Sequence, residues 1–119
     1  MVRLGYVPDH GDLVWINLNP QKGHEQAGHR PAIVLSPKDY NRKTGLCVIC
    51  PATRQAKGYA FEVHIVPAGE PSGVILADHV RCVDWRLREI RLIRKASPKV
   101  LEEVVAMLEA LIINPDDQG

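Results

Sequence analysis

The sequence predicts a mainly β (α+β) domain, a small β-barrel followed by one C-terminal α-helix. Three observations lead to this prediction. Short apolar runs separated by turn residues occupy most of the chain, at least one run alternates between apolar and polar residues, and helical spacing of apolar residues is confined to the C-terminal segment. The 119 residues fit a single domain over 1–119, and this length allows a buried core without disulfide or metal staples.

The expected strands are apolar runs bounded by turn clusters. Phe61, Val63 and Ile65 alternate with polar residues, which is typical of a half-buried strand. The run Leu13–Leu18 is apolar on both faces, so we expect it at the centre of the sheet or at an interface. In full, the predicted strands are Leu13–Leu18, Ala32–Leu35, Leu46–Cys50, Phe61–Val66, Val74–Ala77 and a weaker Arg91–Arg94. Short strands joined by turns favour a small barrel or curled sheet over about residues 6–95.

A helix is expected after the strands, over about residues 98–113. Ser97 can cap its first turn, and Pro98 is favourable at the first helical position. Apolar residues from Val100 to Ile112 recur at helical spacing, and Asn114-Pro115 ends the pattern. We expect this amphipathic helix to pack on the barrel.

Composition limits the class of protein. The net charge of +1 gives no global attraction for nucleic acid, so a binding surface must be local. Basic residues concentrate in Arg81–Lys95 and acidic residues in the C-terminal tail, which predicts faces of opposite charge. The chain has no apolar run long enough to span a membrane and no secretion signal at its start. An odd count of three cysteines is typical of a reducing compartment, so we expect a cytoplasmic protein without a membrane partner.

The segment His24–Pro31 holds the richest set of reactive side chains: two imidazoles, a carboxylate and a guanidinium. The polar stretch from Pro20 to Arg30 is expected to be a loop, either at a functional site or as a solvated connector. Cleavage of RNA needs a base for the 2′-hydroxyl proton, a positive charge for the phosphorane and an acid for the leaving 5′-oxygen. A histidine or glutamate here could act as the base and Arg30 as the phosphate clamp. The alternative for Arg30 is a structural ion pair where the loop meets the strand.

The sequence does not favour a metal site or a cofactor. His24 and His29 are five positions apart, which does not place them on one helix face. Cys47 and Cys50 imitate a CxxC pair, but on a strand they would point to opposite faces. We therefore expect these cysteines to be buried as small hydrophobic residues.

Several other positions have both a functional and a structural interpretation. The Thr53 hydroxyl could bond a phosphate oxygen, or Thr53 could be an ordinary β-branched strand residue. Arg54 and Lys57 flank the next turn, where they could hold phosphates or simply be solvated. Trp15 and Trp85 could stack on bases, although buried aromatic anchors are the favoured interpretation.

A series of motifs runs through the chain in a fixed order. They are Gly11-Asp12-Leu13-Val14-Trp15, Asn19-Pro20, His24-Glu25-Gln26-Ala27-Gly28-His29-Arg30-Pro31, Val34-Leu35-Ser36-Pro37, Tyr40-Asn41-Arg42-Lys43-Thr44-Gly45, Thr53, Lys57-Gly58-Tyr59, Phe61-Glu62-Val63, Gly73-Val74, Ala77-Asp78 and Trp85-Arg86. In these motifs the chain resembles the MazF/PemK/Kid family of toxins, from about Tyr6 to Leu111. Trp85-Arg86 resembles the MazF branch in particular.

The resemblance implies an SH3-like barrel with an appended C-terminal helix, and a twofold homodimer whose interface lines an RNA groove. It implies metal-independent cleavage of single-stranded RNA at a short recognition sequence, leaving a 2′,3′-cyclic phosphate and a 5′-hydroxyl. It also implies a cognate MazE-like antitoxin that fills the groove with an acidic, initially disordered tail. The basic segment Arg81–Lys95 is a physically reasonable counterpart for such a tail.

Carried over by position, Arg30 and Thr53 match the family's catalytic arginine and threonine, and Glu25 matches an acidic residue implicated in cleavage. The general base stays open among Glu25, His24 and His29. The residues expected to bind substrate are His24, Gln26, His29, Asn41, Lys57 and Asp78.

Two departures from the family pattern affect the expected mechanism and specificity. Asp78 falls where the Kid branch has a proposed base, but Leu76 stands where that branch has its proposed acid arginine, so we expect the MazF arrangement. Ala52 and Arg54 differ from the usual residues around Thr53, and His79 replaces the commoner glutamine. We expect these differences to alter base preference and to preserve cleavage.

Two other functions remain as alternatives. The first is a non-enzymatic toxin on the same barrel that binds DNA gyrase, because fold alone does not fix function. The second is a family member that binds RNA or antitoxin without cutting, with a salt-dependent affinity for RNA.

Overall fold

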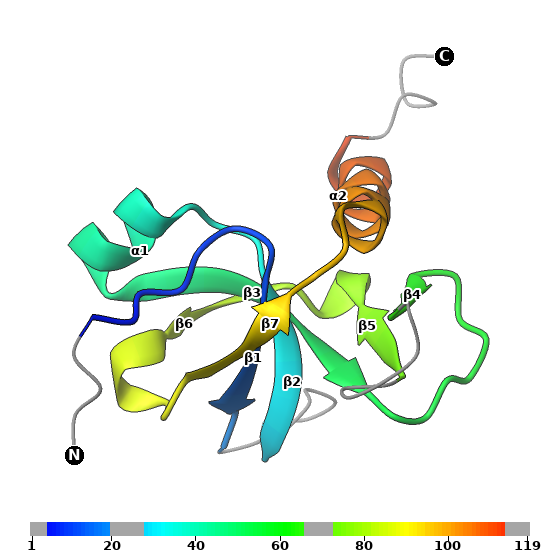
Figure 1. Ribbon diagram of the computed structural model, residues 1–119. Helices are drawn as coiled ribbons and strands as arrows, with labels where there is room; N and C mark the ends of the chain where they lie inside the picture. The colour runs from blue at the N-terminus through cyan, green and yellow to red at the C-terminus, as the bar shows by residue number, and fades with distance from the viewer. Residues whose placement is uncertain (1–4, 20–27, 66–72, 114–119) are drawn as a thin grey trace.

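The computed structural model describes residues 5–19, 28–65 and 73–113 (Figure 1). Its elements, in chain order, are β1 (Asp12–Asn17), β2 (His29–Val34), α1 (Lys38–Thr44), β3 (Leu46–Thr53), β4 (Glu62–His64), β5 (Val74–Leu76), the 3-10 helix η1 (Ala77–His79), β6 (Arg81–Asp84), the 3-10 helix η2 (Trp85–Leu87), β7 (Arg91–Lys95) and α2 (Pro98–Ile112). The predicted strands and C-terminal helix are all present. No helix in these ranges is long and apolar enough to cross a membrane.

The strands form one antiparallel sheet in the order β4-β5-β3-β2-β1-β7, and β6 pairs with β3 outside this path. β3 pairs with three strands. It pairs with β2, and in addition Leu46–Ile49 pair with β6 whereas Ala52 and Thr53 pair with β5. The sheet curls around this strand (Figure 1). Within the described ranges no ladder joins β6 to β7, so the sheet is barrel-like without closing. The predicted mainly β fold with an appended helix is confirmed in this open form.

The central strands bury both faces. On one face Leu13, Ile33 and Cys50 lie side by side across β1, β2 and β3 and pack toward α2. On the other face Val14 packs with Cys47 in a second cluster. The two β3 cysteines therefore point to opposite faces, as their spacing predicts, and burial raises the pKa of each thiol to about 12. Both are consequently neutral hydrophobic residues at physiological pH.

α2 begins as the sequence predicts, but its buried stripe is narrower than expected. The Ser97 hydroxyl accepts a hydrogen bond from the amide of Val100 at 3.3 Å. Val100 and Val104 are fully buried against the sheet. By contrast, Leu111 and Ile112 are 44% and 73% exposed, so the prediction that they pack on the barrel is wrong. The helix projects beyond the sheet at this end, as Figure 1 shows.

The sequence analysis missed α1 and β6. α1 ends at Gly45, which has a positive φ of 74° and donates its amide to the Asn41 carbonyl at 3.0 Å. Its one buried residue is the polar Asn41, so the helix has no apolar stripe to detect. β6 buries only Val83 and therefore has no apolar run. Both elements depend on tertiary contacts with β3 rather than on a local pattern.

Two carboxylates fasten the segment before β1. Asp12 accepts hydrogen bonds from the Tyr6 hydroxyl at 2.9 Å and the Asp9 amide at 3.0 Å. Lys95 at the end of β7 places its Nζ 2.7 Å from Asp12 Oδ1 and 3.6 Å from Asp9 Oδ2. Asp9 also accepts from the Lys38 amide at 3.1 Å, which links the segment to the start of α1. The Asp9–Asp12–Lys95 cluster thus joins three parts of the chain.

Candidate functional site

A pocket of about 390 Å³ opens where the ends of β1 and β3 meet the beginning of β2. The pocket combines an aromatic ring, positive charge and a hydroxyl. Its lining residues are Trp15, His29, Arg30, Pro31, Ala52, Thr53, Arg54 and Gln55. Six of these lie on strands β1, β2 and β3, and the other two, Arg54 and Gln55, directly follow β3. The sheet therefore holds one wall, and the β3–β4 loop contributes the rim.

Arg30 on β2 and Thr53 on β3 line the pocket from two neighbouring strands. The paired positions run from Val34 with Ile49 to Ala32 with Pro51. Arg30 and Thr53 each lie two residues beyond the last of these pairs, where Arg30 pairs with Ile16 of β1 and Thr53 with Val74 of β5. Both are partly buried and line the pocket. Arg30 is the second residue of β2, not a loop residue before it, so the strand fixes its backbone.

His29 also lines the pocket and has an acidic neighbour. Its Nε2 is 3.8 Å from Oε1 of Glu89, and the same oxygen accepts a hydrogen bond from Asn17 Nδ2 at 3.2 Å. Glu89 has a left-handed backbone with φ of 52°, so it lies at a tight turn before β7. The sequence analysis gave Glu89 no role, and its distance along the chain from His29 explains why. Its carboxylate can orient the imidazole.

The two tryptophans have different environments. Trp15 is partly buried on β1, opposite Pro31, and forms a wall of the pocket. Trp85 is buried, and its indole nitrogen donates to the Asn41 carbonyl at 2.9 Å. The buried-anchor interpretation is therefore right for Trp85, whereas Trp15 presents its ring to the candidate site.

Lys57 and Asp78 are both exposed, and neither lines the pocket. The Lys57 backbone amide is occupied by the carboxylate of Glu62, at 3.0 and 3.2 Å from its two oxygens. Asp78 lies on η1, where its charge adds to the burial that raises the pKa of Cys50. Any contact of these two residues with a substrate would lie outside the pocket.

Asn41 is placed differently from its prediction as a substrate-binding residue. It is fully buried, with a relative exposure of 0%. Its Oδ1 accepts from the Ser36 hydroxyl at 2.6 Å, and its Nδ2 donates to the carbonyls of Pro8 and Ser36 at 2.7 and 3.0 Å. All its amide hydrogen-bonding groups are used internally, so the prediction is corrected to a structural role.

The remaining predicted site residues, His24, Glu25 and Gln26, lie outside the described residues. Gly28 and Asn19 bracket that segment, and the Gly28 amide donates to Asn19 Oδ1 at 3.0 Å. Gly28 immediately precedes His29, the first residue of β2, which lines the pocket. Within 5–19, 28–65 and 73–113, no three His, Cys, Asp or Glu side chains gather in a way that could hold a metal ion.

Comparison with known proteins gives consistent matches over nearly the whole chain. Residues 9–112 match the family described as PemK-like, MazF-like toxin of type II toxin–antitoxin systems. The chain is 50% identical over 107 residues to the endoribonuclease toxin MazF of Escherichia coli K12, covering 90% of this chain and 96% of that protein. It is also similar to the crystal structure of MazF from Deinococcus radiodurans, with 53% identity and a TM-score of 0.87 over 91% of this chain and 98% of that one. A MazE–MazF crystal structure from the same organism matches with 47% identity and a TM-score of 0.80 over 91% of this chain and 97% of that one.

Proposed function

This chain belongs to the PemK-like, MazF-like toxin family of type II toxin–antitoxin systems, and from that premise we propose that it is an endoribonuclease that cleaves single-stranded RNA without a metal ion. The observation that carries the proposal is that Arg30 and Thr53 line one pocket. The products would be a 2′,3′-cyclic phosphate and a 5′-hydroxyl. Cleavage of messenger RNA in the cytoplasm would inhibit translation and arrest growth.

The reaction assigns a distinct task to each group. The RNA 2′-oxygen loses its proton to a base and forms a bond to phosphorus, while the bond from phosphorus to the 5′-oxygen breaks and that oxygen gains a proton. Arg30 supplies fixed positive charge to the phosphorane oxygens, since a guanidinium stays protonated and binds phosphate through two hydrogen bonds. The Thr53 hydroxyl can donate to a phosphate oxygen or accept from the attacking hydroxyl. His29 is the candidate base within the described pocket, beside His24 and Glu25 outside the described residues.

The pocket favours a single nucleotide with its phosphate. Its volume is at the small end of the range for ligand sites, which is about 300–1,000 Å³. A base unstacked from a single strand can lie on the ring of Trp15, whereas a duplex would keep its bases paired and stacked. Arg54 and Gln55 on the rim supply hydrogen-bond donors, and Gln55 also an acceptor, that could read a base edge.

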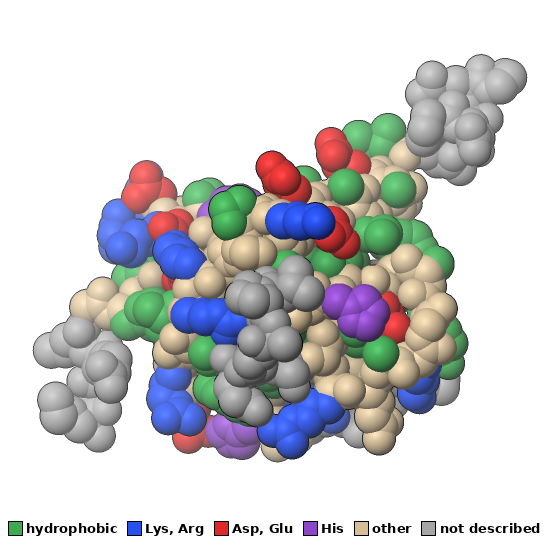
Figure 2. All heavy atoms as spheres, turned by 45° about the vertical axis from the view of Figure 1, so that its right-hand side comes forward, with side chains coloured by type: hydrophobic (Ala, Val, Ile, Leu, Met, Phe, Trp, Pro, Cys, Tyr) green, Lys and Arg blue, Asp and Glu red, His purple; other side chains and the backbone are tan. Residues whose placement is uncertain are grey.

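Two protein partners complete the proposal. The first is a second copy of this chain, supported by the exposed apolar end of α2, where Leu111, Ile112 and Ile113 are 44%, 73% and 58% exposed. The second is a MazE-like antitoxin with an acidic tail, supported by the MazE–MazF complexes among the similar structures. Arg86 and Arg91 are exposed in the basic segment, whereas acidic side chains gather along α2 (Figure 2). An acidic tail would be attracted to the exposed arginines of the basic segment and repelled by the acidic side chains of α2.

The deciding experiment incubates the purified protein with a long defined RNA in excess EDTA, beside an Arg30→Ala, Thr53→Ala double variant. The 3′ and 5′ ends of the products are then mapped. Cleavage by the parent alone, at one repeated short motif and with the expected ends, would support the proposal. Growth arrest by both proteins without RNA cleavage would refute it and favour a toxin that binds gyrase.

A further inference from the structure

The β3–β4 loop, residues 54–61, is held by a carboxylate on the strand that follows it. Glu62 Oε1 accepts hydrogen bonds from the amides of Lys57 and Gly58 at 3.2 and 3.0 Å, and its Oε2 accepts from Lys57 at 3.0 Å. Gly58 has a positive φ of 78°, a conformation that glycine adopts without strain, and its amide donates to the same oxygen as that of Lys57. The two amides therefore converge on one internal anion.

Glu62 is itself fixed in the sheet. It begins β4 and pairs with Leu76 of β5, and its own amide donates to the Tyr59 carbonyl at 3.2 Å. At the other end of the loop the Gln55 amide lies 3.4 Å from the Thr53 hydroxyl oxygen. The loop is thus fastened at its start beside the pocket and at its centre by Glu62. Between these attachments lie Arg54 and Gln55, which form the pocket rim.

The charge of Glu62 is maintained by the loop. Hydrogen bonds from the amides of Lys57, Gly58 and Tyr59 outweigh desolvation and lower the pKa of Glu62. The carboxylate is therefore ionised at neutral pH and occupies the amides that could otherwise receive an RNA phosphate. Glu62 consequently affects the site through the shape of the loop and not through contact with the substrate.

We propose that Glu62 is a positioning residue, which holds the β3–β4 loop so that Arg54 and Gln55 face the pocket and select the nucleotide beside the scissile phosphate. This inference rests on the proposed ribonuclease function. Arg30 and Thr53 are held by strands and keep their places without Glu62. Loss of the carboxylate should therefore weaken substrate selection more than it slows the chemical step.

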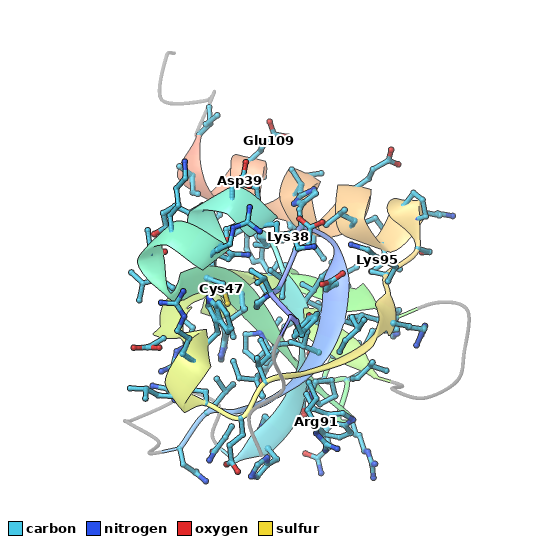
Figure 3. All side chains as sticks on the ribbon, turned by 60° about the vertical axis from the view of Figure 1, so that its left-hand side comes forward. Lys38, Asp39, Cys47, Arg91, Lys95 and Glu109 are labelled. Carbon is cyan, nitrogen blue, oxygen red and sulfur yellow. The ribbon has the colours of Figure 1, made fainter. Side chains whose placement is uncertain are left out.

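The test compares the parent with Glu62→Gln, which keeps size but removes the charge, and with Glu109→Gln as a matched control. Glu109 is an exposed acid on α2, at the opposite end of the molecule from Arg91 (Figure 3). Steady-state cleavage is measured on an RNA with the preferred site and on RNAs with single-base changes around it. For Glu62→Gln we expect KM to rise about threefold to tenfold, kcat to stay within about twofold, and discrimination between sites to fall, because charge-assisted hydrogen bonds are lost. The control should match the parent.

Two further measurements separate positioning from general stability. Hydrogen exchange at the amides of Lys57 and Gly58 should accelerate in Glu62→Gln, while amides in β2 and β3 keep their protection. Gln55→Ala should reduce discrimination in the same way, and combining it with Glu62→Gln should add little, since both act through one loop. The inference would be overturned if the double variant lost discrimination by the sum of the two single losses. It would also be overturned if Glu62→Gln lowered kcat and left KM and selectivity unchanged.

The outcome also distinguishes this inference from the function on which it rests. If the parent does not cleave RNA, both the proposed ribonuclease function and the role of Glu62 are refuted. Cleavage by parent, Glu62→Gln and control with the same KM and the same selectivity would leave the ribonuclease function in place and overturn the role of Glu62 alone.

Discussion

Arg30 and Thr53 line the same pocket, although α1 and most of β3 separate the two residues along the chain. Arg30 pairs with Ile16 of β1 and Thr53 pairs with Val74 of β5, so strand pairing rather than a loop holds the backbone of both residues. Sites built on strands keep their geometry more accurately than sites built on loops. The proposed chemistry therefore depends on the register of the β1–β2 and β3–β5 ladders.

Replacing Arg30 by alanine should lower the single-turnover cleavage rate on the order of 10²–10³-fold, because the fixed charge on the phosphorane is lost. Arg30→Lys should recover only part of the rate, since an ammonium lacks the planar fork. Arg42→Ala is the control, because Arg42 is exposed on α1 and its guanidinium pairs with Asp39 at 2.7 Å. Equal rates for Arg30→Ala and Arg42→Ala would contradict a catalytic role for Arg30.

Trp15→Ala should weaken RNA binding by about 1–3 kcal/mol if a base stacks on the ring, whereas Trp15→Phe should keep most of the affinity. Binding is measured by fluorescence anisotropy in an Arg30→Ala background, so that the RNA stays intact. If Trp15→Phe and Trp15→Ala bind RNA as tightly as the Arg30→Ala protein itself, the ring does not contact the substrate.

Asn41→Ala should lower the free energy of unfolding by about 1–3 kcal/mol, because its buried partners lose their hydrogen bonds. Urea denaturation measures the loss. Cleavage per folded molecule should remain near that of the parent, since the side chain is buried. A variant with parental stability and no cleavage would restore Asn41 as a substrate-binding residue.

The Asp9–Asp12–Lys95 cluster should make the free energy of unfolding depend on pH in both the acid and the alkaline range. Partial burial raises the pKa of Asp9, but hydrogen bonds from the His10 and Lys38 amides and the charge of Lys95 outweigh it, so the pKa falls below its ordinary value. The stabilisation is therefore complete above about pH 4 and is lost as the pH falls through the folded pKa. The hydrogen bond to Asp12 raises the pKa of Lys95, so its contribution disappears as the pH rises past the folded pKa.

Asp9→Asn should accordingly flatten the acid limb of the stability curve, measured as the free energy of unfolding against pH. Asp39→Asn is a suitable control, since Asp39 is an exposed acid on α1 whose carboxylate pairs with Arg42 and lies outside the cluster. An unchanged acid limb in Asp9→Asn would show that the cluster does not set acid stability.

The local sequence pattern predicts those elements that bury a regular run of apolar residues or begin with a capping residue. Leu13–Leu18, Leu46–Cys50 and the Ser97 cap were identified because apolar runs and capping residues carry local signals. α1 and β6 bury one residue each and carry no such signal. The exposed end of α2 shows the opposite error, because helical spacing continues beyond the sheet that could cover it.

The candidate site was predictable only in part for the same reason. Arg30, Thr53 and His29 were identified by residue chemistry and family resemblance, and all three line the pocket. Their proximity depends on strand register, which no local spacing encodes. The Glu89 contact with His29 and the buried amide of Asn41 likewise depend on distant parts of the chain.

The division of the pocket between strand and loop has an evolutionary consequence. Arg30 and Thr53 lie on strands whose pairing fixes their position, whereas Arg54 and Gln55 lie on a loop that tolerates substitution. A lineage of such enzymes can therefore diversify its target sequences while inheriting a constant cleavage apparatus. Exchange of the 54–61 segment between relatives offers a route to retargeted ribonucleases, provided that the incoming segment brings its own counterpart of Glu62.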